Sequence, residues 1–299
     1  MGTPRLIYTF VWAAFTAATA TAVAAKPLKV IASFSILADV VQQVGGDHVE
    51  VLSLVPPSGD PHSFEPSPAD ATNLENAGLV FLSGVGLESW FDRLARASGY
   101  QGTPVVVSNG IKLRELERDG KLSDDPHVWN SPLNVETWVG NIANALRSAD
   151  PADASDYQRR ADRYIGELKR LDADAHAQFD PIPDDRRKIL ISHNAFGYLG
   201  RDYRIEFLSP LGLSTETEAS ASGIAQLIDQ IRREHVKVYF VEANRDPRLV
   251  QQIAAATGIR PGGNLYAEAL SSADGPAPTY LAMFRHNVGK LAQAMAASE

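Results

Sequence analysis

Short apolar runs alternate with segments of helical periodicity along most of the chain. Residues 28–33 read Leu-Lys-Val-Ile-Ala-Ser, and helical spacing follows over 34–44 until Gly45-Gly46, a typical helix stop. Because strands that are joined by helices lie parallel with right-handed crossovers, the pattern predicts an α/β fold with small, mostly parallel sheets flanked by helices. The expected strands are 28–33, 49–55, 79–82, 105–107, 189–192, 205–208, 236–241 and 264–267.

One segment between the two halves lacks this alternation. From Ala152 to about Phe179, apolar side chains recur every three or four residues without a strong helix breaker. A helix of that length spans about 40 Å, enough to run from one lobe to another. We therefore expect an N-terminal α/β lobe over residues 26–150, a long linking helix over 151–180 and a C-terminal α/β lobe over 181–299.

The first 25 residues have the composition of a signal peptide. Arg5 is their one charged residue, residues 6–20 are mostly apolar, and Ala22-Val23-Ala24 suits a cleavage site. A membrane anchor is the alternative, but threonines break the apolar run, which is shorter than the about 20 residues that a span needs. The sequence thus predicts export, with residues 1–25 cleaved and a mature chain that starts near Lys26.

The composition argues against several classes of protein. The chain has no cysteine, which excludes thiolate metal sites, disulfides and a lipid-modified N-terminal cysteine. A net charge of −8 argues against nucleic-acid partners, because phosphate contacts need a basic surface. Motifs typical of dinucleotide-binding proteins, P-loop NTPases, serine hydrolases and common zinc proteases are missing.

Four potential metal ligands each follow a strand-like run. His62 and His127 lie in two copies of the tripeptide Asp-Pro-His, His193 follows residues 188–192, and Glu268 follows 264–267. The carboxyl ends of parallel strands form the crevice in which α/β proteins bind ligands. Imidazole suits zinc and other late first-row metals, and a carboxylate can complete four-coordination. The sequence therefore predicts one shared metal site and no catalytic residues.

For other residues near the predicted metal site, two interpretations are open. Asp60 and Asp125, which precede the two Pro-His pairs, can orient an imidazole from behind or cap the following turn. For the fourth ligand we favour Glu268 over Asp274, because Asp274 lies in a Gly- and Pro-containing stretch typical of a surface turn. The remaining histidines lie among charged residues and are expected at the surface; they are His48, His176, His235 and His286.

With these residues, the chain resembles the zinc- and manganese-binding periplasmic solute-binding proteins of ABC importers. The resemblance runs from Val30 to Asn287, and its segments are specific because they occur together in this order around a long helix. They are Gly59-Asp-Pro-His62-Ser-Phe-Glu-Pro66, Asp125-Pro-His127-Val-Trp129, Ser192-His193-Asn-Ala-Phe-Gly-Tyr198 and Gly263-Asn-Leu-Tyr-Ala-Glu268-Ala-Leu270.

The resemblance implies two α/β lobes joined by one rigid helix, with the metal in the cleft between them. Carried over by motif, His62 and His127 come from the first lobe, and His193 and Glu268 from the second. Glu268 departs from the family, which usually has Asp at this position. The loop over residues 109–125 also departs, because many zinc-binding members have a His-rich loop there and this one has no histidine.

The function that the resemblance implies is capture of a divalent metal in the periplasm and delivery to an ABC permease in the inner membrane. We expect a monomer that binds Zn²⁺, with Mn²⁺ or Fe²⁺ as the alternative cargo. A zinc metalloenzyme is the competing class, although three histidines and a carboxylate fill the position that a catalytic zinc keeps open for water. Cell adhesion is a third reading, and the missing lipid cysteine argues against a surface anchor.

Overall fold

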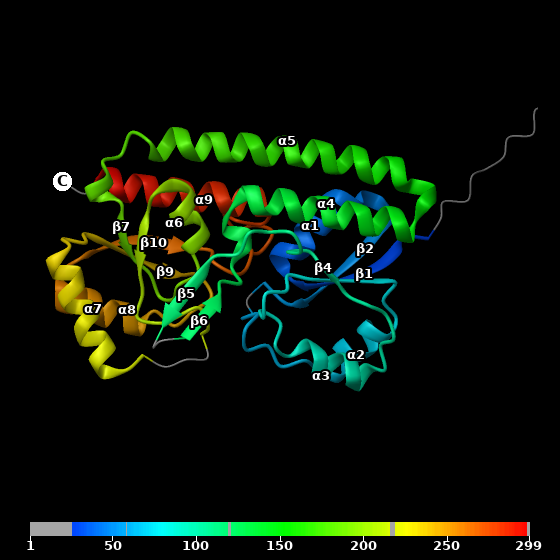
Figure 1. Ribbon diagram of the computed structural model, residues 1–299, viewed down its shortest axis with the longest axis horizontal. Coiled ribbons are helices and arrows are strands. Elements are labelled where there is room, and N and C mark those ends of the chain that lie inside the picture. Colours follow the sequence, from blue (N-terminus) through cyan, green and yellow to red (C-terminus); the bar gives the residue numbers. More distant parts are fainter. Residues whose placement is uncertain (1–25, 58, 119–120, 216–218, 298–299) are drawn as a thin grey trace, which may run out of the picture.

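The computed structural model describes residues 26–57, 59–118, 121–215 and 219–297. The expected signal peptide, residues 1–25, lies outside the described residues. Two four-stranded parallel sheets each carry helices, and one long helix runs along both (Figure 1). The prediction of two α/β lobes joined by a long helix is therefore confirmed, while their residue boundaries stay a prediction. Within the described ranges, no helix is long and apolar enough to span a membrane.

The first sheet has the strand order β2-β1-β3-β4, and every neighbouring pair is parallel. Its central strand β1 is buried from Val30 onward, as expected for a strand covered on both faces. Helix α1 lies on the side of α4 and α5, and α2 and α3 lie below the sheet (Figure 1). The elements are β1 (Leu28–Phe34), α1 (Ser35–Gly45), β2 (Val49–Val55), α2 (Pro68–Glu75), β3 (Leu79–Leu82), α3 (Phe91–Ser98), β4 (Val105–Val106) and α4 (Pro132–Ala149).

The second sheet repeats this design with the strand order β10-β9-β7-β8, again all parallel. Helix α9 packs against β10 and α5, and α7 and α8 pack against each other at the far end of this lobe (Figure 1). The elements are β7 (Lys188–Leu190), α6 (Gly197–Tyr203), β8 (Glu206–Leu208), α7 (Ala221–Arg233), β9 (Val238–Glu242), α8 (Arg248–Thr257), β10 (Arg260–Leu265) and α9 (Tyr280–Ala296).

The strands that precede His193 and Glu268 end before the positions that the sequence indicates. Strand β7 ends at Leu190 and β10 ends at Leu265, so His193 and Glu268 both follow after a short loop and not directly after the strand. For β10 the reason is a side chain of α9. The side-chain amide of Asn287 accepts from the backbone N–H of Tyr266 at 2.9 Å and donates to the carbonyl of Tyr266 at 2.7 Å. These two bonds take the place of backbone hydrogen bonds between Tyr266 and a neighbouring strand.

The prediction that residues 109–125 form a loop is wrong in part. Strands β5 (Glu115–Arg118) and β6 (Lys121–Asp124) form an antiparallel hairpin there. These strands carry charged residues at most positions, so they lack the apolar alternation by which a half-buried strand is recognised. The hairpin leads directly into His127, and Figure 1 shows it reaching from the first lobe toward the second.

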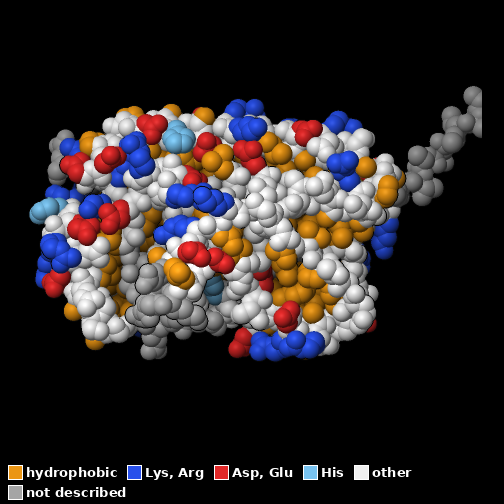
Figure 2. All heavy atoms as spheres, in the orientation of Figure 1, with side chains coloured by type: hydrophobic (Ala, Val, Ile, Leu, Met, Phe, Trp, Pro, Cys, Tyr) orange, Lys and Arg blue, Asp and Glu red, His pale blue; other side chains and the backbone are white. Residues whose placement is uncertain are grey.

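Helix α5 (Ala154–Phe179) is the linking helix that the periodicity predicts. It packs against α1 and α4 of the first lobe and α9 of the second, and its outward face carries charged side chains of both signs (Figure 2). Its buried face belongs to a hydrophobic core that includes residues of both lobes. The buried residues of this helix are Tyr157, Ala161, Tyr164, Leu168, Leu171, Ala175 and Phe179.

The shared core predicts that the linking helix stabilises the whole fold. Leu168 is fully buried, so Leu168→Ala should lower the free energy of unfolding by about 2–5 kcal/mol through lost contacts and a residual cavity. Arg163 is exposed on the same helix, and Arg163→Ala should change the free energy of unfolding by less than about 0.5 kcal/mol. Urea denaturation followed by circular dichroism measures both. Equal effects of the two substitutions would contradict the packing described.

Candidate metal centre

His62 follows β2 through a loop that the structure fixes at two points. Asp60 Oδ1 accepts from the backbone N–H of His62 at 2.9 Å, which is a side-chain turn of the kind that Asp favours. Trp90 Nε1 donates to the carbonyl of Pro61 at 2.8 Å. The imidazole of His62 is buried as a result.

His127 follows the β5–β6 hairpin and is held by a buried carboxylate. Asp125 Oδ1 accepts from the backbone N–H of His127 at 3.0 Å and lies 2.8 Å from its Nδ1. Arg114 Nη1 donates to the other oxygen of Asp125 at 2.9 Å. These contacts fit both interpretations of Asp125. The bond from the backbone N–H closes the turn, and the contact with Nδ1 orients the imidazole, because a proton on Nδ1 leaves Nε2 as the acceptor for a metal.

His193 has the same arrangement in the second lobe. Its Nδ1 lies 2.8 Å from Glu242 Oε1, and its backbone N–H donates to the same oxygen at 3.1 Å. Glu242 is the last residue of β9 and is buried. Sequence reasoning missed Glu242, although an acidic residue that ends an apolar strand run is a signal that could have found it.

Glu268 is buried in the loop after β10, and the first lobe anchors that loop. Trp129 Nε1 donates to the carbonyl of Ala267 at 2.7 Å. The side chain of Asn130 donates to the carbonyl of Ala195, in the loop that carries His193, at 2.9 Å. The segment after His127 therefore holds in place both loops of the second lobe that carry candidate ligands.

The four predicted residues meet in one buried cluster between the lobes. One candidate ligand atom from each lies within 4.8 Å of all the others. Glu268 Oε1 lies 2.7 Å from Nε2 of His62, 3.1 Å from Nε2 of His127 and 3.2 Å from Nε2 of His193. Tetrahedral zinc with bonds of about 2.0–2.1 Å needs ligand atoms about 3.3 Å apart, so the donor set and its spacing fit a metal ion.

Asp274 is not part of this cluster. It is exposed, and its carboxylate interacts with Ser272 in its own turn. Among the described residues, no second group of three or more histidines and carboxylates has its ligand atoms gathered as closely. His48 instead places its two ring nitrogens on different carboxylates, those of Asp153 and Asp156.

The electrostatics of the cluster follow from burial and opposite charge. Burial favours neutral imidazole, but the carboxylates of Glu242 and Glu268 outweigh it and raise the pKa of His193 to about 10. The pKa of His127 is also raised, because Asp125 and Glu268 overcome the same burial effect. Burial alone would raise the pKa of Glu268, yet the neighbouring histidines hold it well below its usual range.

Arg245 is a further residue of the centre that sequence reasoning missed. It lies in the turn after β9, and its Nη2 donates to Glu268 Oε2 at 2.7 Å. A run of charged residues around it, Arg245-Asp246-Pro247-Arg248, has the composition of a solvated loop, so burial against Glu268 had no signal in the sequence.

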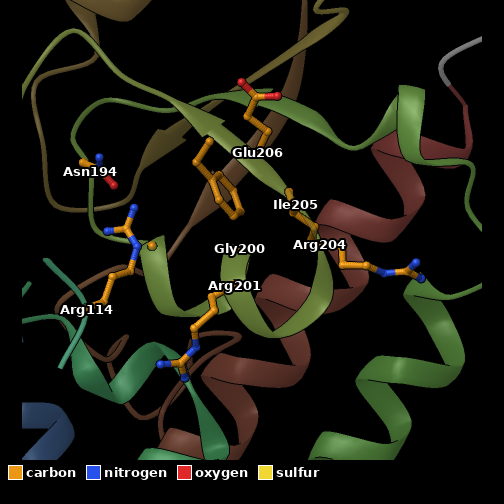
Figure 3. Close-up of a pocket in the computed structure, with 9 residues that line it drawn as sticks. Arg114, Asn194, Gly200, Arg201, Arg204, Ile205 and Glu206 are labelled. Atoms are coloured by element: carbon orange, nitrogen blue, oxygen red, sulfur yellow. The ribbon is translucent and has the colours of Figure 1, made fainter. Parts of the chain in front are cut away.

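A pocket of about 440 Å³ lies next to the centre, on the outer side of Arg114. Figure 3 shows its three arginines pointing in different directions. Each is paired with a carboxylate, Arg114 with Asp125 at 2.9 Å, Arg201 with Asp202 at 2.7 Å and Arg204 with Asp180 at 3.6 Å. The pocket is therefore bordered by Arg114, while Asp125 stays fully buried behind it, and it does not gather ligands of its own.

The sequence also matches a protein family. Residues 30–294 match the family model described as zinc-uptake complex component A, periplasmic. The chain belongs to this family. Members are metal-binding components of ABC importers and not enzymes, so metal binding and transport are the function of this chain and the metalloenzyme reading is not supported.

The relatives of this chain are described with different metals. The iron-binding protein YfeA of Yersinia pestis is 32% identical over 272 residues, which cover 90% of this chain and 86% of that protein. A Mn-bound periplasmic metal binding protein from Candidatus Liberibacter asiaticus has a TM-score of 0.82 at 29% identity, and the periplasmic zinc binding protein TroA of Treponema pallidum has one of 0.84 at 26%. Each match covers 90% of this chain and 99% of the solved one.

The raised histidine pKa values predict that metal affinity depends on pH. A metal must displace the protons of His127 and His193, so affinity should rise with pH from 5 toward about 10, the pKa of His193, by about tenfold per pH unit for each proton displaced. If the histidines had the unperturbed pKa of about 6.5, the affinity would stop rising at a lower pH. Calorimetry in buffers of different ionisation enthalpy measures the protons released.

His235→Asn is the control, because His235 is exposed and outside the cluster. It should leave the pH profile unchanged. An affinity for the wild-type protein that stays flat between pH 5 and pH 8 would contradict ligation by the buried histidines.

Proposed function

We propose that this chain captures Zn²⁺ in the periplasm with His62, His127, His193 and Glu268 and delivers it to an ABC permease in the inner membrane. The observation that carries the proposal is the convergence of three imidazole Nε2 atoms on one carboxylate oxygen in a buried cluster. Zinc is the cargo in this proposal. Cleavage after the first 25 residues, a monomeric state and the lobe boundaries at residues 150 and 180 belong to the same proposal.

The chemistry of the ligand set favours zinc over manganese and iron. Three nitrogens and one oxygen are the usual donors of four-coordinate zinc, whereas Mn²⁺ favours more oxygen ligands. For a given set of nitrogen and oxygen donors, intrinsic affinity also rises from Mn²⁺ through Fe²⁺ toward the later metals. Since the relatives include an iron-binding, a Mn-bound and a zinc-binding protein, the donors of this chain are the better guide to its own cargo.

The environment of the ligands favours binding and delivery. All four are buried, and carboxylates hold the Nδ1 atoms of His127 and His193, so the imidazoles are pre-oriented for a metal. Such a site binds tightly and stays closed to bulk water. Release then requires the two lobes to shift relative to each other, because His62 and His127 come from one lobe and His193 and Glu268 from the other.

Competition between zinc and manganese tests the choice of cargo. The protein should bind one Zn²⁺ per chain, and a large excess of Mn²⁺, about 100-fold or more, should be needed to displace half of it. Calorimetric titration of Zn²⁺ in the presence of increasing Mn²⁺ measures the ratio of the two dissociation constants. Displacement at equal concentrations would contradict the zinc preference.

Substitution of the carboxylate tests the fourth ligand. Glu268→Ala should weaken zinc binding by about tenfold or more, a loss expected even for a group that only supports a ligand. Asp274→Ala is the matched control in the same loop region and should leave the dissociation constant nearly unchanged. If Asp274→Ala weakens binding and Glu268→Ala does not, the ligand assignment in the second lobe is wrong.

A further inference from the structure

We propose that Arg245 sets the metal preference of the centre by occupying the second oxygen of Glu268, so that this carboxylate gives the metal one oxygen and not two. Arg245 contacts the ligand and not the metal, so it acts as a positioning residue. The inference rests on the proposed function, because it assumes that Glu268 is the fourth ligand.

The two oxygens of Glu268 have separate partners. Oε1 faces the three imidazoles, at 2.7 Å from His62 Nε2, 3.1 Å from His127 Nε2 and 3.2 Å from His193 Nε2. Oε2 accepts a charge-assisted hydrogen bond from Arg245 Nη2 at 2.7 Å. The carboxylate is thus oriented with one oxygen toward the imidazoles and the other toward the guanidinium.

Arg245 is itself fixed by other carboxylates. Its Nη2 lies 3.0 Å from Asp60 Oδ2, which also accepts from the hydroxyl of Thr215 at 2.8 Å. Its Nε forms an ion pair with Glu242 Oε2 at 3.1 Å, without the alignment of a hydrogen bond. The side chain is only 13% exposed. To turn Glu268 into a two-oxygen ligand, the protein would have to break a buried ion pair, which is costly.

The number of oxygens matters because the candidate cargoes differ in what they need. Zinc is satisfied by four ligands in a tetrahedron, which three imidazoles and one oxygen provide. Mn²⁺ favours oxygen-rich sites with more ligands, and a carboxylate that binds through both oxygens would add one. Because Oε2 is bonded to Arg245, it is not available to the metal. The coordination number therefore stays low, which weakens the binding of Mn²⁺ more than that of Zn²⁺.

The test uses three variants of the full chain. Arg245→Met keeps the length of the side chain but removes its charge and donors, and Arg245→Lys restores one charged donor. Arg248→Ala removes a highly exposed arginine three residues away as the control.

Two measurements are made on each protein. The ratio of the Zn²⁺ and Mn²⁺ dissociation constants comes from competition titration, and the visible spectrum of the Co²⁺-loaded protein reports coordination number, because four-coordinate Co²⁺ absorbs much more strongly than five- or six-coordinate Co²⁺. In Arg245→Met the preference for zinc should fall by about tenfold or more, as expected for loss of a partner to a buried charged group. Its Co²⁺ absorption should weaken.

Arg245→Lys and Arg248→Ala should keep the strong absorption and a zinc preference within about threefold of wild type, which is less than the tenfold that 1.4 kcal/mol represents. An Arg245→Met protein with wild-type spectrum and preference would overturn the inference. So would an Arg248→Ala protein that reproduces the Arg245→Met result, because the effect would then come from loss of any positive charge in this loop.

The outcomes also separate this inference from the proposed function. If the wild-type protein prefers zinc and gives a four-coordinate spectrum but Arg245→Met does the same, only the role of Arg245 fails. If the wild-type protein shows no zinc preference, the proposed function fails as well. Should Arg245→Met not fold, X-ray absorption on the zinc-loaded wild type decides, since one carboxylate oxygen at about 2.0 Å supports the inference and two bound oxygens overturn it.

Discussion

The structure depends on how it balances charge inside a buried cluster. A carboxylate or imidazolium that is removed from water is costly unless it is paired and hydrogen-bonded. The two lobes meet this requirement in the same way. Asp125 backs His127 and is paired with Arg114, and Glu242 backs His193 and is paired with Arg245. Each chain of contacts ends on a nitrogen that faces Glu268, so the groups that offset the cost of burial also orient the proposed ligands.

The contacts between the lobes explain how this balance is kept. Tyr198 of α6 accepts from the backbone N–H of Arg114 and donates to the carbonyl of Asp125, both at 3.0 Å, so the second lobe holds both ends of the β5–β6 hairpin. The hydroxyl of Tyr280 donates to the carbonyl of Trp129 at 2.9 Å. With α5 packed along both lobes, a wide opening would break these contacts. We therefore infer that the lobes shift by small movements, which suits a carrier that must hold a metal and then release it.

The sequence alone predicts the architecture because its signals are repeated. Strand runs followed by helical spacing, and one long uninterrupted helical segment, require only local patterns, as does the placement of His193 and Glu268 after strand ends. Two of the charged partners had no such signal. Arg114 and Arg245 lie among other charged residues in the sequence, and only the fold shows that they are partly buried against the carboxylates of the centre. The end of β10 was misplaced because Asn287, 21 residues away, pairs with Tyr266.

The central claim is that one metal is held by these four residues across the two lobes. A crystal structure of the zinc-loaded protein, with anomalous data on both sides of the zinc absorption edge, tests it most directly. The account predicts a single strong anomalous peak about 2.0–2.1 Å from Nε2 of His62, His127 and His193 and from Oε1 of Glu268. A peak that lies elsewhere, such as beside His48, or one that lacks any of the four as a ligand, would contradict it.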